Sequence, residues 1–201
     1  MIKLKDLLET DNILIPRRSK EEREKNYTIA IQRQLKSHIK NNVFMVPKIG
    51  PDDDIYGDSF YAREDEELDL NFSREPITHL PDNITKIIGT LDLSDTSLKR
   101  LPSNLTRVER GSLFLNHTKI TELPKNLTYV HYHLDLSVTP LESLPDNLTV
   151  NGNLDLTSTK ITELPKNLTI GGGLSLYGTP LSKKYHLDQL KKMYPNARIY
   201  G

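Results

Sequence analysis

Leucines alternate with polar residues in short stretches that recur between residues 91 and 179. The stretches read LDLSDT from residue 91, LFLNHT from 113, LDLSVT from 134, LDLTST from 154 and LSLYGT from 174. In each L-x-L, both leucines point to one face of an extended strand, and the residue between them points to the other face. The pattern predicts five short strands, each with one apolar and one polar face.

A Leu-Pro pair recurs with the same period as these stretches. The pairs begin at residues 80, 101, 123, 144 and 164, at intervals of 21, 22, 21 and 20 residues. Each pair is followed, after one residue, by Asn and an apolar residue, and the nonapeptide ITELPKNLT occurs at both 120–128 and 161–169. One unit reads L-x-L-x-x-T-x-(I/L)-x-x-L-P-x-N-L-T. A sixth unit fits from Leu68 if two residues are inserted before Ile77.

Strands this short cannot bury their leucines alone, so neighbouring units are expected to stack into a parallel sheet with a continuous apolar interior. The threonines at 96, 118, 139, 159 and 179 recur at a fixed offset, where a hydroxyl can bond a backbone group as the chain turns. Proline fixes φ and lacks a donor, which favours an extended return segment over a helix.

This unit resembles the leucine-rich repeat, whose pattern is L-x-x-L-x-L-x-x-N-x-L, and in particular the short bacterial class that carries Leu-Pro. The resemblance covers residues 68 to about 185. Threonine stands where the common pattern has asparagine, as in similar repeats of bacterial and tailed-phage proteins. The resemblance implies an α/β fold, a leucine-rich-repeat solenoid of about six coils of roughly 20–23 residues with a parallel β-sheet on the concave face.

The two ends of the chain depart from the repeat, as the caps of a stacked solenoid do. We expect an N-terminal helical cap plus acidic loop at 1–67, leucine-rich repeats at 68–185 and a C-terminal cap at 186–201. The stretch HLDQLKKMYPNARIYG at the C-terminus reads as a short helix followed by an apolar strand around Ile199.

The N-terminal part carries an amphipathic pattern. Ser19 and Glu22 form a capping box, and apolar residues at 27, 31, 35 and 39 predict a helix that ends near residues 41–42. The stretch VFMVP at 43–47 fits a strand that covers the first coil, and the acidic segment after it shows no apolar period. The basic residues of this helix offer a nucleic-acid interpretation, whereas its glutamates favour an ordinary solvated face.

Charge and cysteine content narrow the function classes. The chain has 27 Lys and Arg against 27 Asp and Glu, so the net charge gives no argument for nucleic acid or an anionic membrane. It has no cysteine, which removes disulfides, thiolate zinc sites and cysteine nucleophiles. The N-terminus lacks a secretory pattern and no apolar run reaches membrane-spanning length. We expect a cytoplasmic protein, in the host cytoplasm if a phage encodes it.

The polar face of the expected sheet is acidic and rich in hydroxyl groups. Phe114 interrupts the carboxylates at the middle position of L-x-L, where a large apolar side chain can anchor a partner, although single exposed aromatic residues are also common and without function. The candidate partner-binding residues are Asp92, Phe114, Asn116, His133, Asp135, Asp155 and Tyr177.

A metal site is the main alternative use of this face. The stretch HYHLD places His131, His133 and Asp135 on one strand face, with His117 on the adjacent coil, and such groups can bind zinc. A flat strand gives awkward tetrahedral geometry, so a polar face that happens to contain histidines is the simpler interpretation. The acidic loop fails the calcium-binding EF-hand pattern, because Arg63 stands at its twelfth position. We expect no metal and no cofactor.

These patterns favour a non-enzymatic interaction protein, a use typical of curved solenoids. Its partner is expected to be a protein with a basic patch, and the resemblance suggests a phage or bacterial host-directed role. The alternatives are a self-assembling structural or virion-associated subunit and, less favoured, a metal-dependent enzyme. Bacterial effectors with Leu-Pro repeats append a cysteine-dependent ubiquitin ligase domain, which a chain without cysteine does not contain.

Overall fold

The structure is a computed structural model, and it describes residues 39–40, 43–45, 69–195 and 197–200. In this part of the chain the strands form two sheets, which we call sheet A and sheet B. Sheet A consists, in spatial order, of β1 (Ile39–Lys40), β2 (Val43–Met45), β4 (Lys86–Ile88), β6 (Arg107–Glu109), β8 (Tyr129–Val130), β10 (Thr149–Val150) and β12 (Thr169–Ile170). Sheet B consists of β3 (Asp69–Asn71), β5 (Thr90–Asp92), β7 (Leu113–Phe114), β9 (Leu134–Asp135), β11 (Leu154–Asp155), β13 (Gly173–Ser175) and β14 (Arg198–Tyr200).

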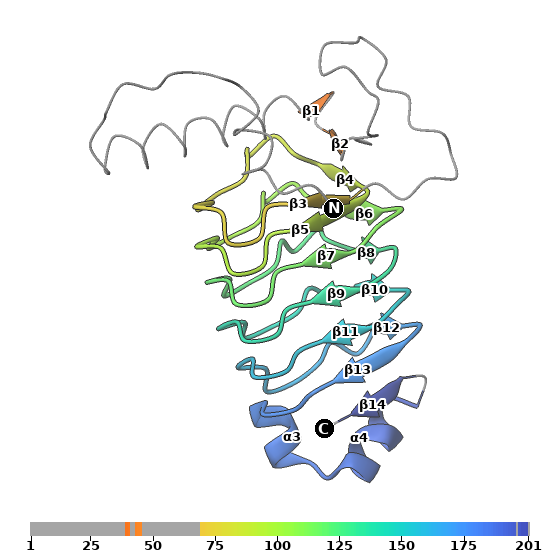
Figure 1. The fold of residues 1–201 in the computed structure, drawn as a ribbon. Coiled ribbons are helices and arrows are strands. Elements are labelled where there is room, and N and C mark those ends of the chain that lie inside the picture. Colours follow the sequence, from red (N-terminus) through yellow and green to blue (C-terminus); the bar gives the residue numbers. More distant parts are fainter. Residues whose placement is uncertain (1–38, 41–42, 46–68, 196, 201) are drawn as a thin grey trace, which may run out of the picture.

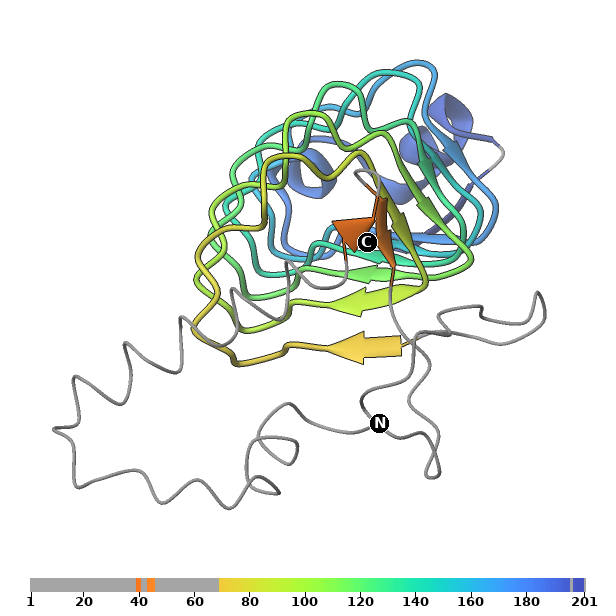
Figure 2. The same ribbon diagram turned by 90° about the horizontal axis from the view of Figure 1, so that it is seen from above.

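From β3 to β13 the chain alternates between the two sheets, so each round of the chain adds one strand to each sheet. Neighbouring strands are parallel, apart from the antiparallel pair of β1 and β2. Figure 1 shows the rounds stacked one upon the next, and Figure 2 shows the two sheets as adjacent sides of one outline. The described chain is therefore an α/β structure with two mainly parallel sheets and few helices.

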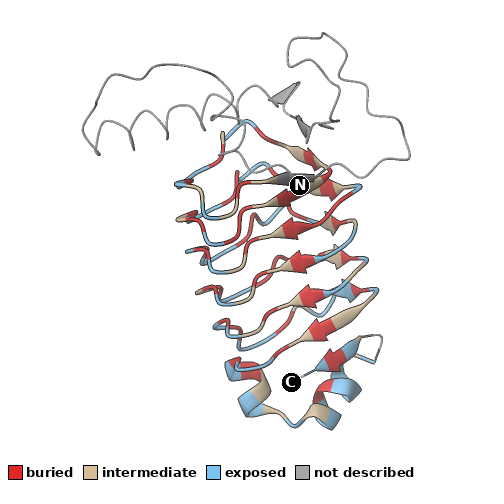
Figure 3. Ribbon diagram, in the orientation of Figure 1, coloured by how far each residue is buried: buried red, intermediate tan, exposed pale blue. Residues whose placement is uncertain are grey.

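The apolar residues of successive rounds stack in rows inside this outline and make up the core, which Figure 3 shows as buried segments along both sheets. The inward row of sheet B consists of Leu91, Leu113, Leu134, Leu154 and Leu174, which are direct strand partners. The inward row of sheet A consists of Ile87, Val108, Val130, Val150 and Ile170. Because each row continues through every round, no single round has a core of its own.

The first round starts two residues later than the sequence pattern suggested. Strand β3 pairs with β5 so that Leu70 lies opposite Leu91, and Asp69 therefore does not take the middle position of the repeat. Counted from Leu70, Ile77 falls at the regular spacing and no inserted residues are needed. Phe72 takes the place of the second leucine and is fully buried. A pattern built on leucine alone misplaced this round because its second core residue is aromatic.

The repeating threonines close the turn after each strand of sheet B. Each hydroxyl donates to the carbonyl oxygen three residues earlier at 2.6–2.8 Å, in the pairs Thr96–Leu93, Thr118–Leu115, Thr139–Leu136, Thr159–Leu156 and Thr179–Leu176. All five threonines are buried. The predicted threonine bonding is confirmed, and its acceptor lies within the same round.

The Leu-Pro segments form the irregular return path from sheet B to sheet A. In four of the five segments the residue three positions after proline donates its N–H to the proline carbonyl, as Leu105 does to Pro102 at 3.0 Å and Leu127 to Pro124 at 2.9 Å. Such bonds define turns, and the described return segments contain no helix before Pro180, as proline predicts. Sheet A itself was not expected, because its strands bury only one residue per round.

The N-terminal predictions are tested only at a few residues. Residues 1–38, with most of the expected helix, and the acidic loop up to residue 68 lie outside the described residues. The expected helix end at 41–42 is wrong, since Ile39–Lys40 is strand β1 and Ile39 pairs with Phe44 of β2. A β-branched residue such as Ile39 suits a strand. The apolar period that predicted the helix does not show whether its last apolar residue belongs to the helix or to a following strand. The expected strand at 43–47 is present as β2, which extends sheet A beside β4.

The C-terminal end agrees with the sequence prediction of a short helix and a strand. Helix α3 (Pro180–Lys184) starts at Thr179, whose hydroxyl caps the helix by accepting the N–H of Ser182 at 3.0 Å. Helix α4 (Leu187–Met193) follows, and β14 then adds to sheet B with Ile199 opposite Leu174. The buried Ile199 therefore covers Leu174, the last leucine of the inward row, at this end of the stack.

Candidate interaction face

The outward residues of sheet B form one continuous face, which we call the acidic face. Strand pairing aligns four of the candidate residues as direct neighbours on β5, β7, β9 and β11, namely Asp92, Phe114, Asp135 and Asp155. The acidic face consists of Thr90, Asp92, Ser94, Ser112, Phe114, Asn116, His133, Asp135, Ser137, Asn153, Asp155, Thr157, Gly173, Ser175 and Tyr177. From β5 to β13 none of these residues is Lys or Arg, and the face carries three carboxylates there, whereas the exposed Arg198 of β14 lies opposite Gly173 at the end of the sheet.

The three aspartates have fixed orientations. In each, Oδ1 accepts the backbone N–H two residues later, at 2.9 Å from Ser94 to Asp92, 2.9 Å from Ser137 to Asp135 and 2.8 Å from Thr157 to Asp155. Asx turns of this kind satisfy a backbone donor where the strand ends. A carboxylate has about four acceptor positions, so each aspartate keeps capacity for a further donor. The same side chains therefore serve the fold and remain able to bind.

Phe114 lies between Asp92 and Asp135 in the row, as the sequence suggested, but its ring is half-buried. Its role as an anchor stays a prediction, and any partner would contact only the exposed part of the ring. The ring sits on an inner strand of the sheet with a neighbouring strand on each side, which limits its exposure. It offers a partner an apolar edge within the row of carboxylates.

Asn116 and Tyr177 lie beyond the strand ends, in the row next to the aspartates. The Asn116 amide nitrogen is 3.4 Å from His117 Nδ1, and Tyr177 is 54% exposed. Tyr200 of β14 is 51% exposed and pairs with Ser175, so it extends the middle row of sheet B. Sequence reasoning missed Tyr200 because it follows the last repeat; alternation around Ile199 was the available signal.

His133 has a structural partner that its sequence context did not indicate. Its Nδ1 accepts the backbone N–H of Asn153 at 2.9 Å. The same relation holds at this position from round to round: Thr90 accepts from Ser112 at 3.2 Å, Ser112 from His133 at 3.2 Å, and Asn153 from Gly173 at 2.7 Å. We call these four bonds the corner relay, since they lie where the chain passes from sheet A into sheet B. His133 contributes to the border of the acidic face and to this relay.

The histidines do not form the cluster expected from HYHLD. Strand β8 ends at Val130 and β9 begins at Leu134, so residues 131–133 turn the corner between the sheets and do not share one strand face. His131 bonds Tyr129 on sheet A at 2.9 Å, whereas His117 faces Asp95 at 3.9 Å. Among the described residues, no group of three or more His, Cys, Asp or Glu could hold a metal ion.

Sheet A carries a second polar group of side chains that sequence reasoning missed. Glu109 Oε1 accepts from Arg107 Nε at 2.8 Å and from Lys86 Nζ at 3.4 Å. The Arg107 guanidinium also lies 4.2 Å above the Tyr129 ring, whose hydroxyl accepts from Asn151 at 2.9 Å. Burial favours a higher pKa for Glu109, but the hydrogen bonds from Arg107 and Lys86 outweigh it and hold that pKa below its ordinary value.

Tyr132 departs from the corner residues of the other rounds. The equivalent residue, one position before the corner relay, is Gly89, Gly111, Gly152 or Gly172 in the other four rounds. A Cβ added at Gly111 would lie 2.1 Å from the Gly89 carbonyl carbon, which explains why glycine is favoured there. Tyr132 is 41% exposed, with its ring 4.4 Å from His131 in an edge-to-face arrangement.

Comparison with known proteins assigns no family to this chain. No protein-family model matches the chain, and no curated protein sequence matches it. In the described part of the chain, no helix is both long enough and apolar enough to cross a membrane. The acidic face is the candidate site on which the geometry concentrates most of the residues that the sequence singled out.

Proposed function

We propose that this chain is a leucine-rich-repeat solenoid that binds a partner protein on its acidic face and has no enzymatic activity. The observation that carries the proposal is the alignment of Asp92, Phe114, Asp135 and Asp155 as direct neighbours on four adjacent strands. Stacked repeats commonly use such an extended sheet surface for binding, and we assign sheet B to the concave side. A phage or bacterial host-directed role fits the form of the repeat.

The partner is expected to present arginine or lysine side chains. Arginine pairs with carboxylates through two parallel hydrogen bonds, and the aspartates have their remaining acceptor positions available. Because Asx bonds already hold the carboxylates in place, little side-chain entropy is lost when a partner binds. Phe114 and the exposed Tyr177 add the aromatic contacts on which protein interfaces depend.

The charge of the acidic face can be removed without disturbing its hydrogen bonds. In the triple variant Asp92→Asn, Asp135→Asn and Asp155→Asn, each amide oxygen can still accept the backbone N–H, whereas the three negative charges are lost. We expect this variant to retain the wild-type unfolding midpoint and to lose capture of its partner. The measurement is affinity capture from a bacterial cytosolic extract with quantitative mass spectrometry, repeated at two salt concentrations.

The matched control removes the same charge elsewhere. Glu122→Gln, Glu142→Gln and Asp146→Asn change three exposed acidic residues on the return segments, outside the acidic face. This control should capture the same partner as the wild type. If both triple variants lose the partner equally, net charge and not the acidic face governs binding; if both retain it, the proposed face is wrong.

Self-assembly is the second candidate, and it is favoured by the charge of the two sheets. Lys86 and Arg107 project from the outer side of sheet A, where Glu109 balances one of their two positive charges, and the remaining charge is opposite in sign to the aspartates of sheet B. One copy could pack its sheet A against the acidic face of another. Sedimentation velocity separates the two functions: a monomer at all concentrations excludes self-assembly, and association that the triple Asp→Asn variant abolishes supports it.

A further inference from the structure

Sheet A ends one step before sheet B at the C-terminal end of the stack. In sheet B, β13 is followed by β14, whereas β12 is the last strand of sheet A in the described chain and has a hydrogen-bonded neighbour only in β10. Within the described residues, no strand pairs with this edge of β12. An unpaired strand edge is a template on which another extended segment can pair.

The backbone of β12 shows which groups face the available edge. Thr169 and Gly171 donate their N–H groups to Leu148 and Val150, so both residues face β10. Successive residues of a strand direct their N–H and C=O groups to alternate sides. Ile170, between them, therefore directs its N–H and C=O away from β10. These are the groups that an added strand would pair with.

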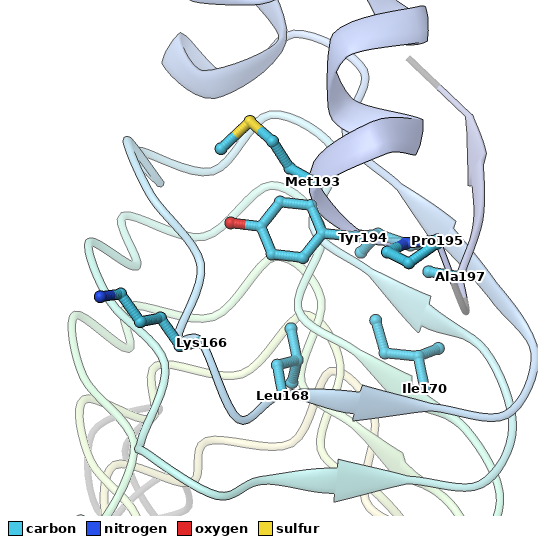
Figure 4. Close-up of a pocket in the computed structure, with 8 residues that line it drawn as sticks. Lys166, Leu168, Ile170, Met193, Tyr194, Pro195 and Ala197 are labelled. Carbon is cyan, nitrogen blue, oxygen red and sulfur yellow. The ribbon is translucent and has the colours of Figure 1, made fainter.

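A crevice of about 110 Å³ lies beside this edge. Figure 4 shows Leu168 and Ile170 projecting from the β12 segment towards Tyr194 and Ala197 of the C-terminal cap. Most of the lining residues are apolar and they also include Leu174, Met193 and Pro195, although polar atoms make up most of the surface that faces the crevice. Since a cavity of about 150 Å³ accepts benzene, this one has room for about one aliphatic side chain.

Tyr194 forms a fixed wall of the crevice. Its hydroxyl donates to the Leu164 carbonyl oxygen at 3.4 Å, and burial raises the pKa of the phenol. The adjacent helix α4 is anchored by the buried Leu190. The Leu190 carbonyl oxygen accepts the N–H of Tyr194 at 2.9 Å. The crevice is therefore part of the folded cap, and a ligand does not have to create it.

Several lysines belong to the segments that border the crevice. Lys166 lines the crevice, and Lys191 and Lys192 lie in the last turn of α4, next to the lining residue Met193. Glu163 is the acidic residue that acts on Tyr194 from the return segment. These three lysines outnumber Glu163 and Asp188, the latter in the first turn of α4, and this charge balance favours an acidic occupant, the opposite of the partner expected for the acidic face.

We propose that the edge of β12 and the adjoining crevice bind an extended acidic peptide segment of a partner protein, which adds a strand to sheet A. One apolar side chain of the segment enters the crevice beside Ile170, and flanking carboxylates meet Lys166 and the lysines of α4. Peptides bind sheet edges in this way through main-chain hydrogen bonds, with pockets for alternate side chains that give specificity. This site is separate from the acidic face and does not depend on the function proposed for it.

The test uses the full-length chain and a fluorescein-labelled peptide, Ser-Glu-Val-Thr-Val-Glu-Ser, measured by fluorescence anisotropy. Two control peptides replace both Val by Ser or both Glu by Lys. We expect saturable binding of the first peptide, about tenfold weaker binding of the serine peptide and several-fold weaker binding of the lysine peptide. Hydrogen exchange at the Ile170 amide should slow on saturation, while exchange at Val130 in the inner strand β8 should not change.

One pair of protein variants tests whether a side chain of the peptide enters the crevice. Ala197→Leu adds bulk inside the crevice and should weaken binding about tenfold, whereas Ser143→Leu adds the same bulk at an exposed return segment and should have no effect. The triple Asp→Asn variant of the acidic face should bind the peptide as the wild type does. The proposal is overturned by absence of saturable binding up to about 1 mM, or by equal binding to both leucine variants.

Two other occupants would also overturn the proposal. If exchange at the Ile170 amide is already slow in the free monomer, another part of the same chain covers β12. If that exchange slows as the protein concentration rises, a second copy covers it, and sedimentation velocity will then show association that Ala197→Leu abolishes.

Discussion

One position of the repeat has the left-handed backbone conformation in every round, and it lies where the chain turns away from sheet B. The residues at this position have φ values between 55° and 72° and stand directly before the threonine position, at Arg74, Asp95, His117, Val138, Ser158 and Gly178. Only glycine adopts this conformation without cost, whereas Asp and Asn tolerate it better than most residues. The repeat therefore imposes a similar local strain in five of six rounds.

Val138 is the least suitable of these residues, because β-branched side chains crowd the backbone at positive φ. It is 45% exposed, so replacing it sacrifices little burial. We expect Val138→Asn to raise the free energy of unfolding by about 1 kcal/mol, measured by urea denaturation. Val138→Ile keeps the β-branch and should give no gain. A gain with Ile as large as that with Asn would show that relief of backbone strain is not the cause.

At the scale of single elements, the two sheets differed in how far the sequence predicted them. Five strands of sheet B, from β5 to β13, are marked by two leucines each, such as Leu134 and Leu136, and they were predicted. The strands of sheet A contain two or three residues with one inward side chain, and alternation cannot be detected over so short a run. The same limit explains why HYHLD was taken for one strand when it includes a corner.

The ion pairs of Glu109 on sheet A make the free energy of unfolding depend on pH. Because Arg107 and Lys86 lower the pKa of Glu109 in the folded state, their contribution to stability is present above the ordinary glutamate pKa of 4.5 and is lost as the pH falls through the lower folded value. We expect the free energy of unfolding to decline below about pH 4.5, and Glu109→Gln to reduce that decline. Chemical denaturation at several pH values measures it.

The control for this prediction is Glu122→Gln, at an exposed glutamate on a return segment. It should leave the pH profile of stability unchanged. A wild-type profile that Glu109→Gln does not alter would show that the contacts on sheet A contribute no measurable pH-dependent stability.

On the scale of the whole molecule, stability depends on contacts between successive rounds, because each row of core residues continues from round to round. The C-terminal end of sheet B is covered by β14, where the buried Ile199 lies opposite Leu174. Loss of this cover exposes the last round first. The loss of local stability should then decrease with distance from the C-terminal end of the stack.

Ile199→Asp tests this dependence on the cap. We expect faster amide hydrogen exchange in β13 and β11, measured residue by residue, with little change in β5 and β7. Arg198→Asp is the matched control, since Arg198 is exposed on the same strand and its replacement leaves the core covered. Equal acceleration of exchange in all strands would mean that the rounds unfold as a single cooperative unit.

The sequence predicted the positions of the candidate residues better than their roles. The period placed Asp92, Asp135 and Asp155 in one row, because residues at the same place in a repeat become neighbours when repeats stack. It could not show that the carboxylates also close Asx turns, or that His133 accepts a backbone N–H. Those contacts depend on the path of the backbone at each corner, which the pattern of side chains alone does not specify.

The corner relay has a direction, and it ends at Gly173. Each earlier member offers an acceptor to the round that follows, but Gly173 has no side chain, and a Cβ there would lie 2.8 Å from the Tyr200 ring. Duplication of an internal round by gene rearrangement would supply both a donor and an acceptor and so continue the relay. A round appended after Gly173 would find no such acceptor. The relay thus gives the stack a polarity, and adding a round inside it preserves one hydrogen bond per corner that adding a round at its end does not.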